Sequence, residues 1–247
     1  DALIGVSMTG IGSAAVLQVD MKAAANIVKR ENTRVSKLIG INKAARTTCV
    51  KPAGTTSLVL GTSSGIHAWH NDYYIRRLRV GKNEAIYKYL INNNPELVKD
   101  EYFRPHDTAV IEIPQASPKG SILRTESAFD LMERVKLVAN DWVKTGHSNG
   151  SNTHNVSATV SLKKDEWDKA GEWMWKNRDC YNGLSVLPYD GGTYTQAPFE
   201  DITKKKFEEL AKLLHDVNLE NVIEVTDETD LSGELACAGG SCEITSL

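Results

Sequence analysis

Two cysteines near the end of the chain, Cys237 and Cys242, have the residue type and spacing for redox chemistry. Four residues separate them, two of which are glycines, so the segment can turn back and close an intramolecular disulfide at small cost in loop entropy. Exposed thiols are open to oxidation, and an accidental pair would be costly to keep. The spacing therefore favours a dithiol that exchanges with other disulfides.

Two other interpretations of this pair remain open. A zinc site needs four ligands, and the segment 223–247 contains no histidine and no cysteines beyond these two. The thiols could also be incidental, although free cysteines are more often buried than left in a polar terminal segment.

A second candidate site is a short run with a cation, a proline–glycine turn and three hydroxyl side chains. Its members are Lys51, Pro52, Ala53, Gly54, Thr55, Thr56 and Ser57. Exposed backbone N–H groups beside short hydroxyl side chains suit a phosphate group. The order GxxxxGK[ST] of a P-loop is absent, so a phosphate cradle and a purely structural turn both remain open. Ser63, Ser64 and Gly65 could add to the same pocket.

The remaining histidines and cysteines carry weaker signals. We expect hydrogen-bonded or solvated side chains rather than metal ligands at His67, His70, His147 and His154, and we predict no metal site. Cys49 is predicted to be a small buried residue of a strand and Cys180 a loop thiol. Core packing is predicted for Trp167, Trp173 and Trp175.

Composition excludes several classes of protein. The 247 residues are 41% apolar and 25% charged, close to the average for globular proteins. The formal net charge of −3 gives no general attraction to nucleic acid or to an anionic membrane. No apolar run approaches the length of a membrane span. Four cysteines without a disulfide-type spacing favour a reducing, cytoplasmic setting.

Strand and helix patterns alternate along the chain. We expect strands at 2–10, 47–49, 73–80, 108–113, 155–162 and 184–188. We expect helices at 13–39, 82–92, 127–144, 164–176 and 203–218, the third of them capped by Ser127 or Thr125. Between these elements, the segments 50–57 and 61–67 are predicted loops. The alternation predicts an α/β fold with parallel pairing, in which loops after strand ends carry the chemistry.

From residue 223 the chain becomes acidic and loses its periodic apolar face. We therefore predict a folded part at 1–222 and a flexible redox-active tail at 223–247. A strand pattern that begins at residue 2, in a chain whose first residue is Asp1, predicts a piece of a longer protein.

Taken together, these segments resemble one family. The ordered segments 1–10, 50–57, 61–67, 187–189 and 196–200 look like the C-terminal third of class II ribonucleotide reductases. The similarity is greatest to the monomeric, adenosylcobalamin-dependent ribonucleoside-triphosphate reductase branch, and it runs from Asp1 to Cys242.

The resemblance implies the C-terminal half of a ten-stranded α/β barrel with a flexible C-terminal tail. It implies an enzyme that makes deoxyribonucleotides from ribonucleoside triphosphates by radical chemistry with adenosylcobalamin. The loop matching Pro52–Ser57 would hold the substrate's phosphates. Cys237 and Cys242 would reduce an active-site disulfide and be re-reduced by thioredoxin or a similar dithiol donor.

One departure from the family pattern is important. The Asn-x-Cys-x-Glu loop of the thiyl-radical cysteine is absent, as are the partner cysteine and the effector-binding region near the family's N-terminus. The resemblance therefore implies a half barrel that is inactive without the N-terminal part of the same enzyme. A fragment of a class I large subunit, or a non-catalytic module that binds nucleotides or docks thioredoxin, remains an alternative.

Overall fold

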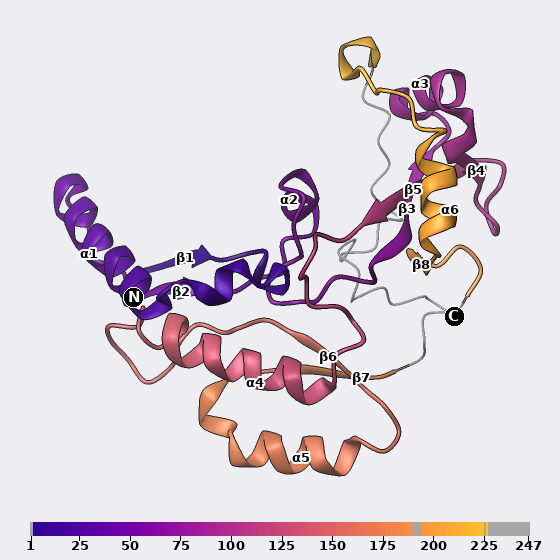
Figure 1. Ribbon diagram of the computed structural model, residues 1–247. Helices are drawn as coiled ribbons and strands as arrows, with labels where there is room; N and C mark the ends of the chain where they lie inside the picture. Colours follow the sequence, from indigo (N-terminus) through magenta and orange to yellow (C-terminus); the bar gives the residue numbers. More distant parts are fainter. Residues whose placement is uncertain (1, 190–193, 225, 227–247) are drawn as a thin grey trace. The chain divides into compact units, whose positions relative to one another are not determined.

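The computed structural model describes residues 2–189, 194–224 and 226 (Figure 1). The chain divides into two compact units, one formed by 1–69 and 119–189 and the other by 70–118 and 190–247. The predicted tail, including Cys237 and Cys242, lies outside the described residues except at 223, 224 and 226. The division at residue 222 therefore stays a prediction.

The first unit is built on parallel strands. They are β1 (Leu3–Ser7), β2 (Arg46–Cys49), β6 (Thr159–Leu162) and β7 (Ser185–Pro188). β1 pairs with β2, β6 pairs with β7, and a single parallel bridge between Val50 and Val156 links the two pairs. Helix α1 (Met21–Ile39) connects the first pair and α5 (Trp167–Lys176) the second. The predicted parallel α/β arrangement is confirmed in this unit.

Helix α1 begins later than residue 13, the predicted start. Two 3-10 turns, Ile11–Ser13 and Ala15–Gln18, precede it, and the residue between them, Ala14, has a left-handed φ of 67°. Asp20 then caps the helix, because its side chain accepts a hydrogen bond of 2.9 Å from the Ala23 amide.

Helix α4 (Ala128–Val138) confirms its predicted cap. The Ser127 hydroxyl accepts from the Asp130 amide while the Asp130 carboxylate accepts from the Ser127 amide, which is a complete capping box. The helix continues into a π-helical turn, Ala139–Val143. Met132, Val135 and Val138 on its inner face are fully buried.

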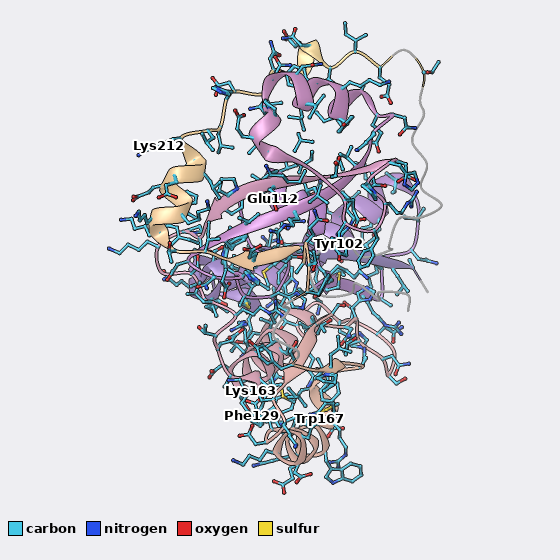
Figure 2. The ribbon with its side chains drawn as sticks, turned by 90° about the vertical axis from the view of Figure 1, so that its right-hand side faces the viewer. Tyr102, Glu112, Phe129, Lys163, Trp167 and Lys212 are labelled. Atoms are coloured by element: carbon cyan, nitrogen blue, oxygen red, sulfur yellow. The ribbon has the colours of Figure 1, made fainter. Side chains whose placement is uncertain are left out.

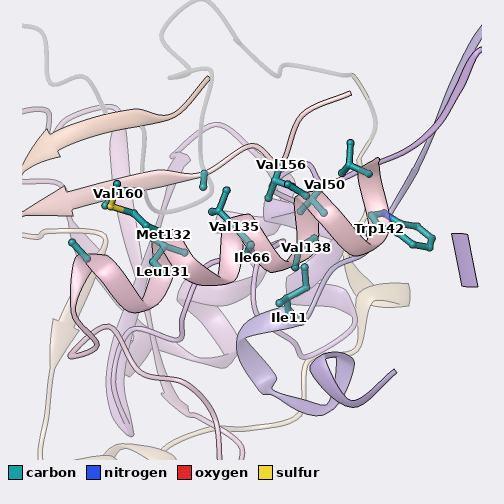
Figure 3. Close-up of a cluster of buried hydrophobic side chains, with 14 of the residues drawn as sticks. Ile11, Val50, Ile66, Leu131, Met132, Val135, Val138, Trp142, Val156 and Val160 are labelled. Carbon is teal, nitrogen blue, oxygen red and sulfur yellow. The ribbon is translucent and has the colours of Figure 1, made fainter. Parts of the chain in front are cut away.

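The core of the first unit lies between α4 and the parallel strands (Figure 3). Its largest fully buried apolar side chains are Ile11, Val50, Ile66, Met132, Val135, Val138, Val156, Val160 and Leu162. These residues come from α4, from β6 and from the segments that join the strands and helices, so the core fixes the loops as well as the sheet.

The second unit contains an antiparallel sheet, so the prediction of parallel pairing is wrong there. Its strands are β3 (Tyr73–Gly81), β4 (Val98–Asp100), β5 (Thr108–Ala116) and β8 (Phe199–Asp201), in the order β4-β5-β3-β8. β5 continues through Pro114, which faces Ile75 of β3. A proline is tolerated there because β4 pairs only with Ala109–Ile111 and leaves the rest of that edge open.

Two helices pack on this sheet. Helix α3 (Ala85–Asn93) packs with β4 and β5 around Leu90, Leu97 and Ile111, and Pro95 begins a 3-10 turn, Pro95–Leu97. Helix α6 (Lys204–Ala211) lies against β3 and β5 and ends well before the predicted residue 218.

Charged side chains also cross this sheet. Arg77 of β3 bonds Glu112 of β5, at 2.7 Å, and Glu200 of β8, so one buried guanidinium connects three strands.

The predicted core packing of the tryptophans is wrong for two of the three. Trp173 packs against the core of the first unit and donates to Glu133 at 2.6 Å. Trp167 is 44% exposed, at the surface in Figure 2, and Trp175 is 72% exposed. Within the described residues, none of the helices combines the length and apolar character needed to cross a membrane.

Candidate functional site

The candidate site begins where β1 and β2 end side by side. Ser7, the last residue of β1, is paired with Cys49, the last residue of β2. The Ser7 hydroxyl accepts a hydrogen bond of 3.0 Å from the Lys51 amide. The first predicted loop therefore leaves the carboxyl edge of a parallel strand pair, where α/β folds place their binding loops.

The predicted loop over 50–57 is wrong in its second half, because helix α2 (Gly54–Val59) begins at Gly54. Pro52 keeps the preceding residue, Lys51, out of the helical region, and the helix starts as soon as this constraint ends. The Ser57 amide donates to the Ala53 carbonyl at 2.7 Å and the Ser57 hydroxyl to the Gly54 carbonyl at 2.9 Å.

The seven predicted residues differ in their exposure to solvent. Lys51, Pro52 and Thr56 are exposed, Ala53 and Gly54 are half-buried, and Ser57 is buried. Thr55 lies in the first turn of α2. Backbone N–H groups in a first helical turn have no acceptor within the helix. The exposed face of this segment therefore offers one lysine, one threonine hydroxyl and main-chain donors.

The second predicted loop, 61–67, packs directly on the first. The Ser64 hydroxyl accepts a hydrogen bond of 3.0 Å from the Ala53 amide. Gly65 has a left-handed φ of 55°, and a Cβ built on it would lie 2.8 Å from the Lys51 carbonyl oxygen. The two loops expected to share a pocket are therefore in contact.

A third segment, the turn after β1, bonds the second loop, and this contact was not predicted. The Thr9 hydroxyl donates to the Ser63 carbonyl at 3.0 Å and accepts from the Gly65 amide at 2.9 Å. The Gly10 amide donates to the same Ser63 carbonyl. The only sequence signal was the position of Thr9, a hydroxyl residue just past a strand end.

His67 fixes the far end of the second loop. Its Nδ1 lies 3.2 Å from the Ser64 carbonyl, and its Nε2 lies 3.0 Å from the Thr159 amide at the start of β6. An acceptor role for Nε2 places the proton on Nδ1. Burial lowers the pKa of His67 below its usual 6.5, so the neutral ring that makes both bonds is favoured.

Cys49 is half-buried rather than fully buried as predicted. Burial raises the pKa of its thiol, while the nearby Lys51 charge and the Ser7 hydrogen bond lower it. Cys180 ends a 3-10 turn, Arg178–Cys180, and both cysteines are free thiols.

Two other predicted histidines bond carbonyl groups that lie outside these loops. His147 bonds the Gly150 carbonyl at 2.8 Å, and His154 bonds the Ile4 carbonyl at 2.9 Å. Within residues 2–189, 194–224 and 226, no three metal-ligating side chains are grouped as they would be around an ion.

Comparisons with known proteins find relatives along most of the chain. An adenosylcobalamin-dependent ribonucleoside-triphosphate reductase of Lactobacillus acidophilus is 29% identical over 212 residues, which cover 85% of this chain and 28% of that protein. A protein of the same name from Euglena gracilis is 27% identical over 256 residues, covering 97% of this chain and 33% of the relative. No protein-family model matches.

A solved structure, the crystal structure of a B12-dependent (class II) ribonucleotide reductase, matches with a TM-score of 0.69. The match has 21% sequence identity and covers 88% of this chain and 34% of that one. The resemblance to class II ribonucleotide reductases is therefore confirmed, and the solved structure supports a mixed α/β fold of the same kind. The chain spans about a third of the length of the proteins it matches.

Proposed function

We propose that this chain is the C-terminal segment of an adenosylcobalamin-dependent ribonucleoside-triphosphate reductase. The observation that carries the proposal is that relatives with this name align with 85% to 97% of the chain. The parallel strands β1, β2, β6 and β7 are then one side of the ten-stranded barrel, and the remaining strands come from the N-terminal part of the same enzyme.

In this proposal the segment Lys51–Ser57 binds the phosphates of the ribonucleotide. The exposed lysine and the main-chain donors at the start of α2 suit an anion, and their place at the ends of β1 and β2 is the usual place for substrate loops. Ser57 supports the turn from within, since its buried hydroxyl bonds the Gly54 carbonyl.

The cofactor assignment rests on the names of the relatives. Adenosylcobalamin supplies radical chemistry when bound. The part of the chain that the structure describes contributes the substrate loops, while the radical-forming cysteine belongs to the N-terminal part.

The tail dithiol has a defined redox role in the proposal. Reducing the ribose 2′-hydroxyl takes two electrons, which two active-site thiols supply as they form a disulfide. A thiolate of Cys237 or Cys242 attacks that disulfide, the second tail thiol resolves the mixed disulfide, and the active-site dithiol is restored. The tail disulfide then receives two electrons from thioredoxin or a similar donor.

The test is co-expression of this chain with the N-terminal part, followed by a ribonucleotide reduction assay. We expect activity with adenosylcobalamin, none without it, and none from this chain alone. Activity that instead requires a separate metal-containing subunit would assign the chain to a class I large subunit.

A further inference from the structure

The Thr9 hydroxyl is the contact that joins the end of β1 to the second loop. Its oxygen donates to the Ser63 carbonyl at 3.0 Å and accepts from the Gly65 amide at 2.9 Å. A threonine hydroxyl carries one hydrogen and two lone pairs, so Thr9 uses its only proton on this loop. The two bonds hold the loop on both sides of Ser64.

Ser64 connects the second loop to the first loop. Its carbonyl accepts from the His67 amide at 3.0 Å, and its hydroxyl accepts from the Ala53 amide at 3.0 Å. Ala53 is the residue immediately before α2. The hydroxyl of Ser64 is therefore aimed at the point where the first loop becomes a helix.

We propose that Thr9 is a positioning residue for the phosphate loop, acting through Ser64. By fixing the loop at Ser63 and Gly65, it keeps the Ser64 hydroxyl on the Ala53 amide and holds the turn from Lys51 to Gly54 in its binding shape. This inference rests on the proposed function, because it assigns a role toward the phosphates of that substrate.

Loss of the Thr9 hydroxyl should weaken substrate binding. Without it the Gly65 amide loses its acceptor, and the second loop gains conformations in which Ser64 no longer meets Ala53. A loop that must be ordered during binding lowers affinity by the entropy of that ordering. The contribution of the base and ribose to binding is not affected by this loss.

The experiment compares three threonine variants of the reductase completed with its N-terminal part. Thr9→Val keeps the side-chain shape and removes the hydroxyl, while Thr9→Ser keeps the hydroxyl. Thr33→Val is the matched control, because it removes a hydroxyl whose hydrogen bond goes to the Lys29 carbonyl within α1. The probes are a ribonucleoside triphosphate, inorganic tripolyphosphate and the unphosphorylated ribonucleoside.

We expect Thr9→Val to weaken binding of both phosphate-containing probes about tenfold, close to the value of one lost hydrogen bond. Binding of the ribonucleoside should be unchanged, and Thr9→Ser and Thr33→Val should bind like the parent. Amide hydrogen exchange at Ala53 and Gly65 should accelerate only in Thr9→Val. An unselective loss across all three probes would overturn the positioning role, because a merely unstable protein behaves that way.

Two further variants separate this inference from the proposed function. Gly54→Val places a branched side chain in the phosphate loop itself. If it weakens phosphate binding while Thr9→Val does not, the positioning role is wrong and the loop assignment stands. If neither does, the loop assignment is wrong and the inference falls with it. Should Thr9→Val fail to fold, Ser64→Ala removes only the final bond to Ala53, and unchanged affinity there would equally refute the inference.

Discussion

Replacing Gly65 by alanine is the sharpest test of the contact between the two loops. Gly65 combines a left-handed backbone with a close neighbour, since its φ is 55° and an added Cβ would lie 2.8 Å from the Lys51 carbonyl oxygen. The next atoms, at 3.3 Å, are the Lys51 carbonyl carbon and the Pro52 Cα. All three belong to the backbone, so no side chain can swing away to make room.

The destabilisation expected from Gly65→Ala has two contributions, which a comparison with a second glycine can distinguish. A left-handed alanine costs about 1–2 kcal/mol, and overpacking against the facing backbone adds about 1–3 kcal/mol. Gly61, in the same loop, has a φ of 59° but no heavy atom within 4 Å of its added Cβ. We therefore expect Gly65→Ala to destabilise the loops by about 2–5 kcal/mol and Gly61→Ala by about 1–2 kcal/mol.

The assay is native-state hydrogen exchange over residues 61–69, with nucleotide affinity measured on the same proteins. An extra 2 kcal/mol of local opening corresponds to roughly 30-fold faster exchange. Gly65→Ala should also weaken phosphate binding, because the Lys51 backbone must shift. Equal effects of the two substitutions would show that the close approach of Gly65 to Lys51 contributes nothing, and would refute the reasoning.

Three other predictions concern the first unit and the tail. Glu126→Ala leaves the buried Arg134 guanidinium without its carboxylate partner, whose oxygens lie 2.6 and 2.7 Å from it, and should lower stability by about 3–5 kcal/mol in urea unfolding. The exposed Glu31–Arg34 pair of α1 is the control, and breaking it should have no measurable effect. Burial lowers the pKa of His67 in the folded protein below 6.5, its ordinary value. The stability that the neutral ring contributes should therefore be fully present above pH 6.5 and be lost as the pH falls below that value. The melting temperature of His67→Asn should lack this pH dependence. Cys237→Ser or Cys242→Ser in the completed enzyme should abolish repeated turnover with thioredoxin, and full activity would exclude the tail as the electron carrier.

The parts of the fold that the sequence predicts well are those specified by neighbouring residues. The cap of α4 depends on residues within a single turn, so the sequence predicts a cap at Ser127 or Thr125, and the structure selects Ser127 with its partner Asp130. The strand–helix–strand passages from β1 to β2 and from β6 to β7 follow from alternation of element types, and their parallel pairing was predicted correctly.

The features that the sequence did not predict depend on distant contacts. Alternation in β3 and β5 shows which side chains share a face but not the direction of the neighbouring strand, so the antiparallel sheet was missed. Helix α2 was missed because Pro52 and Gly54 read as loop residues, while the contacts that fix its start come from Ser64. Trp175 was expected in the core, yet the Arg178 guanidinium lies over its ring at 4.7 Å and it stays at the surface.

The candidate site shows the same division. The loops 50–57 and 61–67 could be identified because small and hydroxyl residues are concentrated there. Thr9 could not, because its partners Ser63 and Gly65 lie 54 and 56 residues further along the chain. The pairing of β1 with β2 brings the turn after β1 close to the loop that contains Ser63 and Gly65.

In the proposed reductase, β1 links substrate binding to completion of the sheet. All five residues of β1 are exposed, and among the described strands it pairs only with β2, yet Ser7 at its end and Thr9 just beyond hold both loops. A strand open on both faces gains little stability by itself, so order in the loops depends on what covers β1. In the proposed reductase that cover is the N-terminal part of the enzyme, which would stabilise the loops that bind phosphate. Because linkage is reciprocal, substrate bound to those loops would in turn strengthen the association of the two parts.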